Sequence, residues 1–366
     1  MSSPPTRQRS ARMRGDAVPC MADDAVALWT SADLSTTTGG NLYLRHLIQA
    51  LEEAGVPVRL TAAPPTGAPP RVLLVDSLVL DRAAAWMAAG RGDAAEPPAR
   101  VVALMLFQPS AADPDRAARW RRAEAAVLSR ADVVIAVGPT QGRALRGLVA
   151  SSDRLRVIPP GKDAPGPHPG APSRKPRERL RLLCVANWSP VKRIHLLLEA
   201  LARLPDVVTL DLVGAVLDPD YAARLRAAIV ALGVERRVRV HGPLAGSDLA
   251  RRYAAADVFV LPSAYESYGV AAAEALAFGL PVVGCGVPGL RDLLGEGRGG
   301  ILVPPDDVAA LTSALERVTR DPGLRARLAR EAVARGAALP TWAQTRRALR
   351  EALLPLLGAK AHRPAC

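Results

Sequence analysis

The chain has 366 residues, which is enough for two domains with separate hydrophobic cores. Apolar residues make up 49% of it, as in a globular protein. The formal net charge of +13 allows an anionic ligand or surface, although arginines spread over solvated helix faces are the favoured explanation. No basic cluster alternates with aromatic residues, which argues against a nucleic-acid partner. The four cysteines (20, 184, 285 and 366) are too widely spaced for a zinc site or a disulfide framework, and they predict a reducing cytoplasm.

The N-terminal part predicts a basic tail followed by a Rossmann-like domain. Residues 1–20 are polar, carry four arginines and lack the apolar core of a signal peptide, so we expect a disordered tail. In residues 21–163, short apolar segments alternate with helix-prone ones, which is typical of a parallel sheet covered by helices. The expected strands are 26–29, 56–60, 71–76, 101–106, 132–137 and 155–158, and the first helix spans Asn41–Ala54.

A second domain of the same kind follows a linker. Residues 164–178 are rich in proline, which indicates the linker. Residues 179–340 then predict strands at 181–186, 208–213, 238–241, 257–261, 282–285 and 301–303, with Cys184 and Cys285 as small core residues. Residues 342–357 form an amphipathic helix. The sequence therefore predicts an α/β protein of two doubly wound Rossmann-like domains.

One stretch of the second domain places two glutamates around the start of a helix. Glu266 lies in the loop after strand 257–261, and Glu274 lies in the helix expected over 269–278, about 7 Å along its axis from Gly269. The first amides of a helix lack intrahelical partners and bind anions. Carboxylates on both sides of an anion site match the hydroxyl–phosphate–hydroxyl order of a nucleotide-sugar. On these residues alone, a surface carboxylate and a helix carboxylate paired to an arginine stay open as an alternative.

This segment resembles the E-x7-E block of the retaining glycosyltransferases of family 4, which have the GT-B fold. The resemblance implies two domains facing each other across a cleft, with an acceptor-binding domain at 21–163 and a donor-binding domain at 179–340. A helix in 341–366 would cross back to the first domain. The resemblance also implies that Glu266 holds the donor sugar as a catalytic residue and that Glu274 holds the ribose. The amides expected to face the sugar and diphosphate are those of Gly269, Val270 and Ala271.

The loop after strand 181–186 resembles the family's G-R-L-x-x-x-K-G pattern. Lys192 falls on the lysine that contacts the diphosphate, which makes it a second catalytic candidate, although an ordinary solvated lysine is the alternative. Asn187 replaces the arginine of the pattern and Arg193 replaces its last glycine, so one phosphate cation is absent and Arg193 is the candidate substitute. Gly242, after strand 238–241, is expected to let the nucleotide base approach the backbone.

The first domain supplies the other candidates. Gly39–Gly40 precedes the first helix and would lie near the diphosphate and the acceptor, although a plain turn with Asn41 as helix cap is an equal alternative. Asp76 ends a strand at the carboxyl edge, where ligands bind. Related transferases often carry a histidine after the strand 101–106, but this chain has Phe107 and Gln108, of which Gln108 can hydrogen-bond a hydroxyl. Asn41, Asp76 and Gln108 are the acceptor-side candidates.

Two other patterns do not support a different chemistry. Residues 284–289 satisfy G-x-G-x-x-G, but they come late in the chain and Pro288 interrupts the entry to a helix. Asp218-Pro219-Asp220 looks like the metal-binding Asp-x-Asp of the other glycosyltransferase fold, but Asp220 is expected to cap a helix. We therefore expect neither a metal nor a cofactor.

The resemblance implies transfer of a hexose-type sugar from a nucleotide-sugar to an unidentified acceptor, with retention of anomeric configuration. The positive charge is also compatible with weak peripheral membrane association. Donor, acceptor and oligomeric state are not given by the sequence. Because a histidine, an arginine and a glycine of the family pattern are absent, a non-catalytic nucleotide-sugar-binding relative stays open as an alternative. A nucleotide-sugar epimerase would need further acid/base residues, which the sequence does not show.

Overall fold

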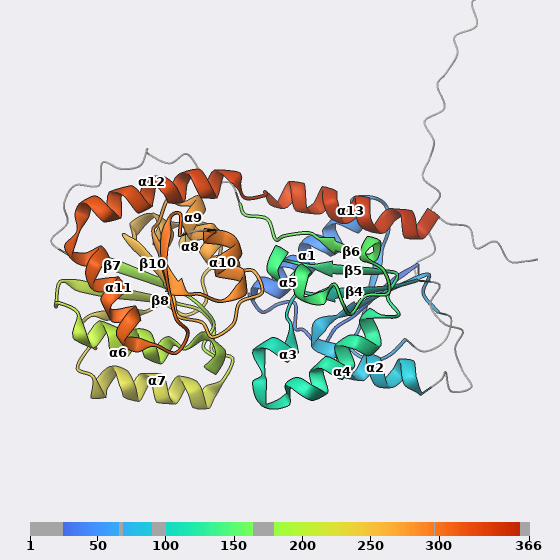
Figure 1. Cartoon of the computed structure of the whole chain (residues 1–366), viewed down its shortest axis with the longest axis horizontal. Helices are drawn as coiled ribbons and strands as arrows, with labels where there is room; N and C mark the ends of the chain where they lie inside the picture. The colour runs from blue at the N-terminus through green and yellow to red at the C-terminus, as the bar shows by residue number, and fades with distance from the viewer. Residues whose placement is uncertain (1–24, 66–68, 90–99, 164–178, 296, 359–366) are drawn as a thin grey trace, which may run out of the picture.

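The computed structural model describes residues 25–65, 69–89, 100–163, 179–295 and 297–358 as two α/β halves, each built on a six-stranded parallel sheet (Figure 1). In the N-terminal half the strand order is β2-β1-β3-β4-β5-β6. The strands are β1 (Val26–Trp29), β2 (Val58–Thr61), β3 (Val72–Asp76), β4 (Arg100–Met105), β5 (Val133–Ala136) and β6 (Leu155–Val157). The helices are α1 (Gly39–Glu52), α2 (Leu80–Ala88), α3 (Pro109–Ala112), α4 (Ala117–Leu128) and α5 (Pro139–Leu145), with 3-10 turns η1 (Ser77–Val79), η2 (Pro114–Arg116) and η3 (Ser152–Arg154).

The C-terminal half has the strand order β12-β11-β10-β7-β8-β9. Its strands are β7 (Leu180–Val185), β8 (Val208–Val213), β9 (Val238–Val240), β10 (Val258–Leu261), β11 (Val282–Cys285) and β12 (Gly300–Val303). The helical segments are η4 (Pro190–Lys192), α6 (Ile194–Arg203), α7 (Pro219–Ala231), α8 (Gly246–Ala255), α9 (Val270–Ala277), α10 (Pro288–Leu294), α11 (Val308–Arg320), α12 (Pro322–Ala338) and α13 (Trp342–Gly358). The predicted class of two doubly wound α/β units is confirmed, and each expected strand is present with its ends shifted by at most two residues.

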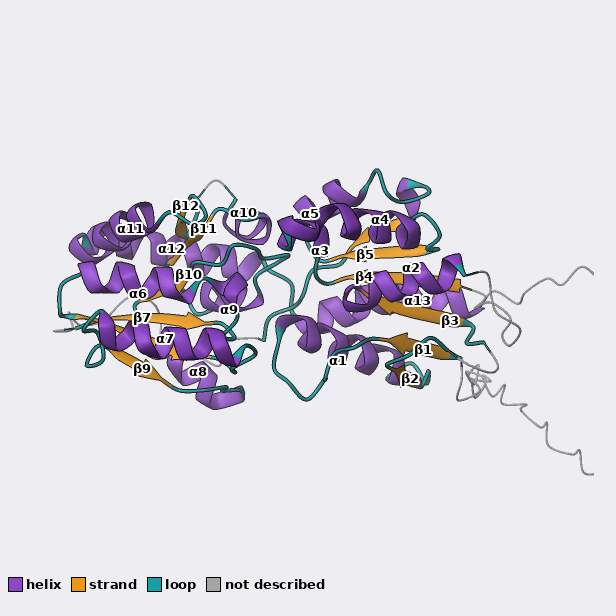
Figure 2. Ribbon diagram, turned by 90° about the horizontal axis from the view of Figure 1, so that it is seen from below, coloured by secondary structure: helices purple, strands orange, loops and turns teal. Residues whose placement is uncertain are grey.

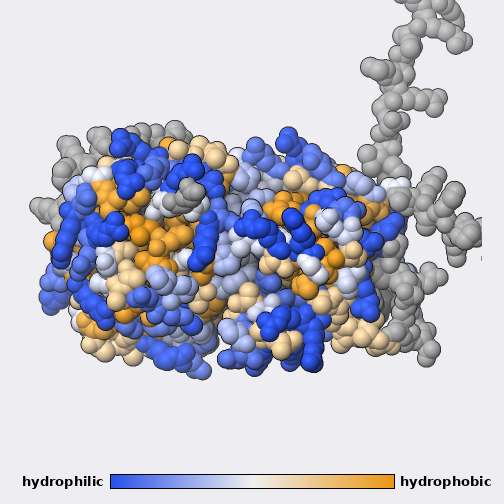
Figure 3. Space-filling view, in the orientation of Figure 1, coloured by the Kyte–Doolittle hydropathy of each residue, from blue (hydrophilic) through white to orange (hydrophobic). Residues whose placement is uncertain are grey.

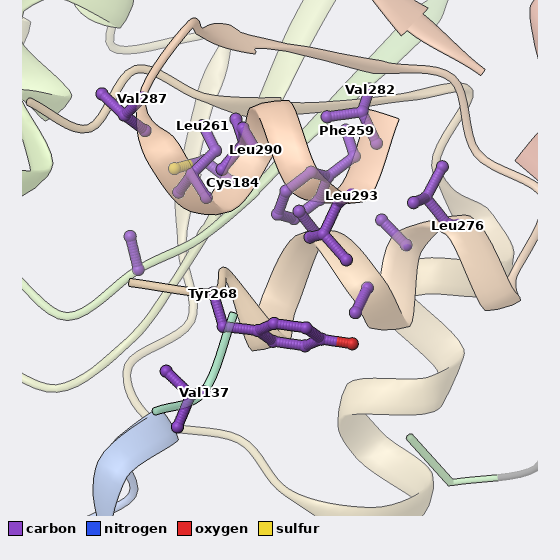
Figure 4. Close-up of a cluster of buried hydrophobic side chains, with 14 of the residues drawn as sticks. Val137, Cys184, Phe259, Leu261, Tyr268, Leu276, Val282, Val287, Leu290 and Leu293 are labelled. Carbon is purple, nitrogen blue, oxygen red and sulfur yellow. The ribbon is translucent and has the colours of Figure 1, made fainter. Parts of the chain in front are cut away.

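Helices cover both faces of each sheet (Figure 2), and the strand sequences follow from this. Strands such as β3, β5 and β10 are buried along their whole length, because a strand enclosed on both faces needs an unbroken apolar run. The core of the C-terminal half includes Cys184 and Cys285, as expected. The same cluster continues into the N-terminal half, where Val137 lies beside Tyr268 (Figure 4). Apolar contact therefore joins the two halves.

The last helix, α13, returns to the N-terminal half and lies along it (Figure 1). The Trp342 ring stacks on the His46 ring of α1 with centroids 4.0 Å apart, and the Thr345 hydroxyl donates to the Pro159 carbonyl at 2.9 Å. Where α13 begins, the Lys162 amide donates to the Pro340 carbonyl at 2.9 Å. The stretches around 162 and 341 thus cross between the halves side by side.

A polar contact joins the halves at a second place. The carboxylate of Asp292 in α10 accepts hydrogen bonds from the Thr140 amide at 2.8 Å and the Thr140 hydroxyl at 2.6 Å. Thr140 lies in the first turn of α5, so a carboxylate from one half caps a helix of the other.

Hydrophilic side chains are spread over the visible face of both halves, interrupted by smaller apolar patches (Figure 3). In the described part of the chain, no helix combines the length and the apolar character needed to cross a membrane. The α9 segment is only 8 residues long and ends at Ala277, and Gly279, which follows its C-cap residue Phe278, has a φ of +67°.

Candidate functional site

A cavity of about 590 Å³ lies between the two halves, at the carboxyl ends of both sheets. From the N-terminal half it is lined by the loops after β1 and β3 and by the start of α1. From the C-terminal half it is lined by the loops after β7, β8 and β10 and by the start of α9. The strand order reverses between β1 and β3 and again between β7 and β10, which is where open α/β sheets bind ligands.

The two residues predicted to be catalytic form an ion pair in this cavity. Lys192 Nζ donates to Glu266 Oε1 at 2.6 Å, and the Ser263 hydroxyl donates to the same oxygen at 2.8 Å. The side chains of Lys192 and Glu266 are 25% and 11% exposed. Both hydrogen bonds that the described residues make to this carboxylate go to Oε1. Oε2 is therefore the oxygen available to accept from a ligand hydroxyl.

The N-terminus of α9 offers amide groups to the same cavity. Its N-cap is Gly269, whose φ of +92° favours glycine, and no side chain caps the helix among the described residues. The first intrahelical bond runs from the Ala273 amide to the Gly269 carbonyl at 3.0 Å, so the preceding amides are free for an anion. A Cβ on Gly39 would lie 3.2 Å from Val270 Cγ2, which shows how closely the start of α1 approaches the start of α9. Two helix N-termini thus converge from opposite halves.

Glu274 lies deeper along α9, in a setting that favours its protonated form. The Tyr253 hydroxyl lies 2.8 Å from Glu274 Oε2 and 3.1 Å from the Ala271 carbonyl. Burial raises the pKa of Glu274 to about 7, although the Tyr253 hydrogen bond acts in the opposite direction. Glu274 therefore changes its charge near neutral pH.

The loop after β7 connects the halves through Asn187. Its Nδ2 donates to the Thr37 carbonyl at 2.9 Å, and its Oδ1 accepts from the Ala215 amide at 2.9 Å.

Arg193 has a φ of +50°, a left-handed conformation that glycine adopts most easily, which accounts for glycine in the family pattern. Its guanidinium pairs with Asp306 at 2.7 Å, and the residue does not line the cavity. Arg193 therefore does not add a second positive charge to the cavity beside Lys192.

At the start of α1 the predicted Asn41 cap is wrong. Thr38 is the N-cap, and its hydroxyl accepts from the Asn41 amide at 3.0 Å. Asn41 lies inside the helix, where its Nδ2 donates at 2.8 Å to the carbonyls of both Asp33 and Thr36. Both threonine and asparagine suit a cap, and here the threonine lies one residue before the helix. Asn41 instead shapes the loop that lines the cavity.

The other acceptor-side candidates differ in their access to the cavity. Asp76 lines it but is 1% exposed, and it accepts from the Thr30 hydroxyl at 2.6 Å and from the Ser77 hydroxyl at 3.1 Å. Burial raises the pKa of Asp76. Its hydrogen bond with Thr30 ties the end of β3 to the end of β1. Gln108 does not line the cavity.

Gly242 also lies outside the cavity lining. Its φ is +66°, and its carbonyl accepts from the Gly214 amide at 2.8 Å. It supports the loop after β8, because Gly214 does line the cavity.

The structure shows no metal centre in its described part, since no group of three or more His, Cys, Asp or Glu side chains is placed to hold an ion. Asp218, and not Asp220, caps α7, and its carboxylate accepts from the Tyr221 amide at 2.8 Å. The predicted Asp220 cap is therefore wrong by two residues, because Pro219 occupies the first helical position.

Comparison with known proteins agrees with this geometry. Residues 171–335 match the family described as Glycosyl transferases group 1. The chain carries a group 1 glycosyltransferase domain. This finding, together with the relatives below, confirms the resemblance to family 4.

The curated relatives match part of this chain. The D-inositol 3-phosphate glycosyltransferase of Xylanimonas cellulosilytica is 37% identical over 220 residues, which cover 56% of this chain and 53% of the relative. The enzyme of that name from Mycobacterium marinum is 31% identical over 275 residues, covering 72% and 54%. The chain thus spans about half the length of the curated relatives it matches.

Solved structures show the fold over nearly the whole chain. Sucrose-phosphate synthase from Thermosynechococcus elongatus has a TM-score of 0.74 at 24% identity, covering 92% of this chain and 99% of that one. HepE from Anabaena, solved in complex with UDP-glucose, has a TM-score of 0.70 at 21% identity, covering 90% and 99%. The expected GT-B fold, with two Rossmann-like domains, is confirmed.

Several lining residues of the cavity were not singled out from the sequence. They belong to the polar run after β1 and to the loop after β8, and they are Asp33, Thr36, Thr37, Thr38 and Gly214. Gly214 had a usable signal, since it directly follows a strand at the carboxyl edge. A Cβ there would lie 2.1 Å from the Ala186 carbonyl oxygen, so glycine is required for the loops after β7 and β8 to pack together.

Proposed function

We propose that this chain transfers a hexose-type sugar from a nucleotide-sugar to an acceptor hydroxyl, with retention of anomeric configuration. The observation that carries the proposal is the presence of the Lys192–Glu266 pair, Glu274 and two helix N-termini around one cavity. The order of these groups matches sugar hydroxyls, phosphates and ribose hydroxyls. The volume of about 590 Å³ lies within the range of ligand sites.

Glu266 and Lys192 would act on the reacting end of the donor. Glu266 Oε2 would accept hydrogen bonds from sugar hydroxyls, while Lys192 holds the other carboxylate oxygen and fixes its orientation. The Lys192 ammonium and the free amides of α9 would stabilise the negative charge that grows on the leaving diphosphate. These groups supply the electrostatic stabilisation without a metal ion.

Retention follows from a same-face displacement. The bond between the anomeric carbon and the donor phosphate oxygen breaks, and a bond to the acceptor oxygen forms on the same face. The leaving phosphate oxygen takes the acceptor proton, so no side-chain base is needed. This suits the end of β4, where the Phe107 ring meets the Tyr265 ring edge-on at 5.4 Å and provides no acid or base.

Donor turnover tests the proposal, with UDP-glucose as the first donor because HepE was solved with it. We expect UDP release and an α-configured product by NMR, and a loss of roughly 100-fold or more in kcat for Glu266→Gln. Glu235→Gln changes an exposed carboxylate outside the cavity and is the matched control. Wild-type turnover by Glu266→Gln contradicts the assignment of Glu266.

Other outcomes point to the alternative functions. Tight binding of nucleotide-sugars with neither hydrolysis nor transfer favours a non-catalytic relative. Conversion of a nucleotide-sugar to its epimer favours an epimerase.

A further inference from the structure

The half of the cavity that faces the acceptor carries no positive charge among its described residues. If the donor occupies the C-terminal side, as proposed above, the acceptor meets the lining contributed by the N-terminal half. The polar side chains of that lining include Asp33, Thr36, Thr37, Thr38, Asp76 and Ser77. None of the described N-terminal lining residues is a lysine, an arginine or a histidine.

Within the described lining of the cavity, no cationic side chain remains for an acceptor phosphate. Lys192 is the single cationic side chain in the described lining, and it lies on the donor side, bound to Glu266. A nucleoside diphosphate already brings more negative charge than one ammonium group balances. A second phosphate, on the acceptor, would therefore be left without a cationic side chain, the partner that arginine or lysine commonly supplies to phosphate.

The acceptor side is instead negative. Asp33 is exposed at the cavity, and hydrogen bonds from the Ser35 side chain and amide lower its pKa, so its carboxylate is ionised at neutral pH. A negative charge here repels an anionic acceptor and leaves a neutral one unaffected.

Hydroxyl groups on the same side fit a polyol. The Thr38 hydroxyl accepts from the Asn41 amide at 3.0 Å, and this leaves its own hydrogen for a ligand. Thr37 uses its carbonyl to bind Asn187, and in the described structure its exposed hydroxyl has no recorded partner. Hydroxyl groups both donate and accept, as do the hydroxyls of a sugar or cyclitol.

We propose that the acceptor is an unphosphorylated polyol, a hydroxyl-rich molecule without an anionic group. The inference rests on the proposed function and names the acceptor class for the same cavity. It separates this chain from its curated relatives, whose name specifies D-inositol 3-phosphate.

Matched pairs of ligands test this inference on the full chain saturated with UDP. The probes are myo-inositol with inositol 3-phosphate, and glycerol with glycerol 3-phosphate, and their dissociation constants are measured by ligand-observed NMR. We expect the neutral member of a pair to bind, and its phosphorylated partner to bind no more tightly. Phosphorylated members that bind ten times more tightly, with an affinity that falls as salt rises, would overturn the inference. It is also overturned if UDP binds and none of these ligands does.

A charge introduced on the acceptor side provides a second, independent measurement. Thr37→Arg should raise the affinity for the phosphorylated members about tenfold, whereas Thr37→Gln, neutral and also long, should not. If Thr37→Arg leaves the phosphorylated members unchanged, position 37 does not face the acceptor and the inference fails. UDP affinity, measured separately by calorimetry, reports on the proposed function. If UDP itself does not bind, that function fails and not merely the acceptor class.

Discussion

Replacement of Glu274 by glutamine should stabilise the protein at high pH and weaken nucleotide binding at the proposed donor site. Burial of the carboxyl group raises the pKa of Glu274 from its ordinary value of 4.5 to about 7. At about 1.4 kcal/mol per pKa unit, the raised pKa lowers the free energy of unfolding at high pH by about 3 kcal/mol.

The direction of the effect follows from proton binding. Between about pH 4.5 and 7 the folded chain keeps the Glu274 proton while the unfolded chain has lost it. The free energy of unfolding therefore falls as pH rises through this window, and the full loss is present above pH 7. Glutamine removes the titration and still accepts a hydrogen bond from Tyr253. The variant should gain up to about 3 kcal/mol at pH 8 and almost nothing near pH 4.5.

Urea unfolding at both pH values, followed by circular dichroism, measures this difference, and Glu235→Gln is the surface control. Nucleotide titration at pH 8 should show the opposite trend. We expect a loss of about tenfold in affinity, because an amide is a weaker acceptor for ribose hydroxyls than a carboxylate. An equal stability change for Glu274→Gln at both pH values would refute the reasoning.

Three further changes test contacts that hold the molecule together. Asp292→Ala removes both cross-half hydrogen bonds to α5 and should lower the free energy of unfolding by about 2 kcal/mol and enlarge the radius of gyration in X-ray scattering. An unchanged radius would show that other contacts keep the halves together. Arg193→Gly should be more stable than Arg193→Ala by about 1 kcal/mol in urea, because both lose the ion pair and only glycine relieves the left-handed backbone. Equal stability would exclude backbone strain at this position. Gly161→Ala places a Cβ 2.2 Å from the Trp342 amide and should lower stability by about 2 kcal/mol, whereas Gly147→Ala meets nothing within 4 Å. Similar melting temperatures for the two alanine variants would contradict the packing of α13.

The sheets could be predicted from the sequence because buried parallel strands leave a strong local signal. Continuous apolar runs mark strands such as β3 and β10, and alternating apolar and polar residues mark β8, each within one or two residues. The spacing of Glu266 and Glu274 around one helix start likewise placed both at the same cavity, because that relation is local.

Contacts between distant segments were not predictable. Nothing in the sequence indicates that Lys192 bonds Glu266, 74 residues later, or that Asn187 reaches Thr37 in the other half. The hydroxyl-rich run at 35–38 has the composition of an ordinary turn, and its place in the cavity depends on how the two halves dock. Competing caps, such as Thr38 and Asn41, are equally good locally, so the sequence alone does not separate them.

The return of α13 to the N-terminal half affects the order in which the chain completes its folding. During synthesis, the surface of α1 around Tyr43 and His46 leaves the ribosome long before Trp342 exists to cover it. The contact between His46 and Arg346 closes a loop of 300 residues, and such distant contacts form late. The C-terminal sheet needs no strand from outside residues 180–303, so it can assemble before α13 docks. The half that is synthesised first is therefore completed last.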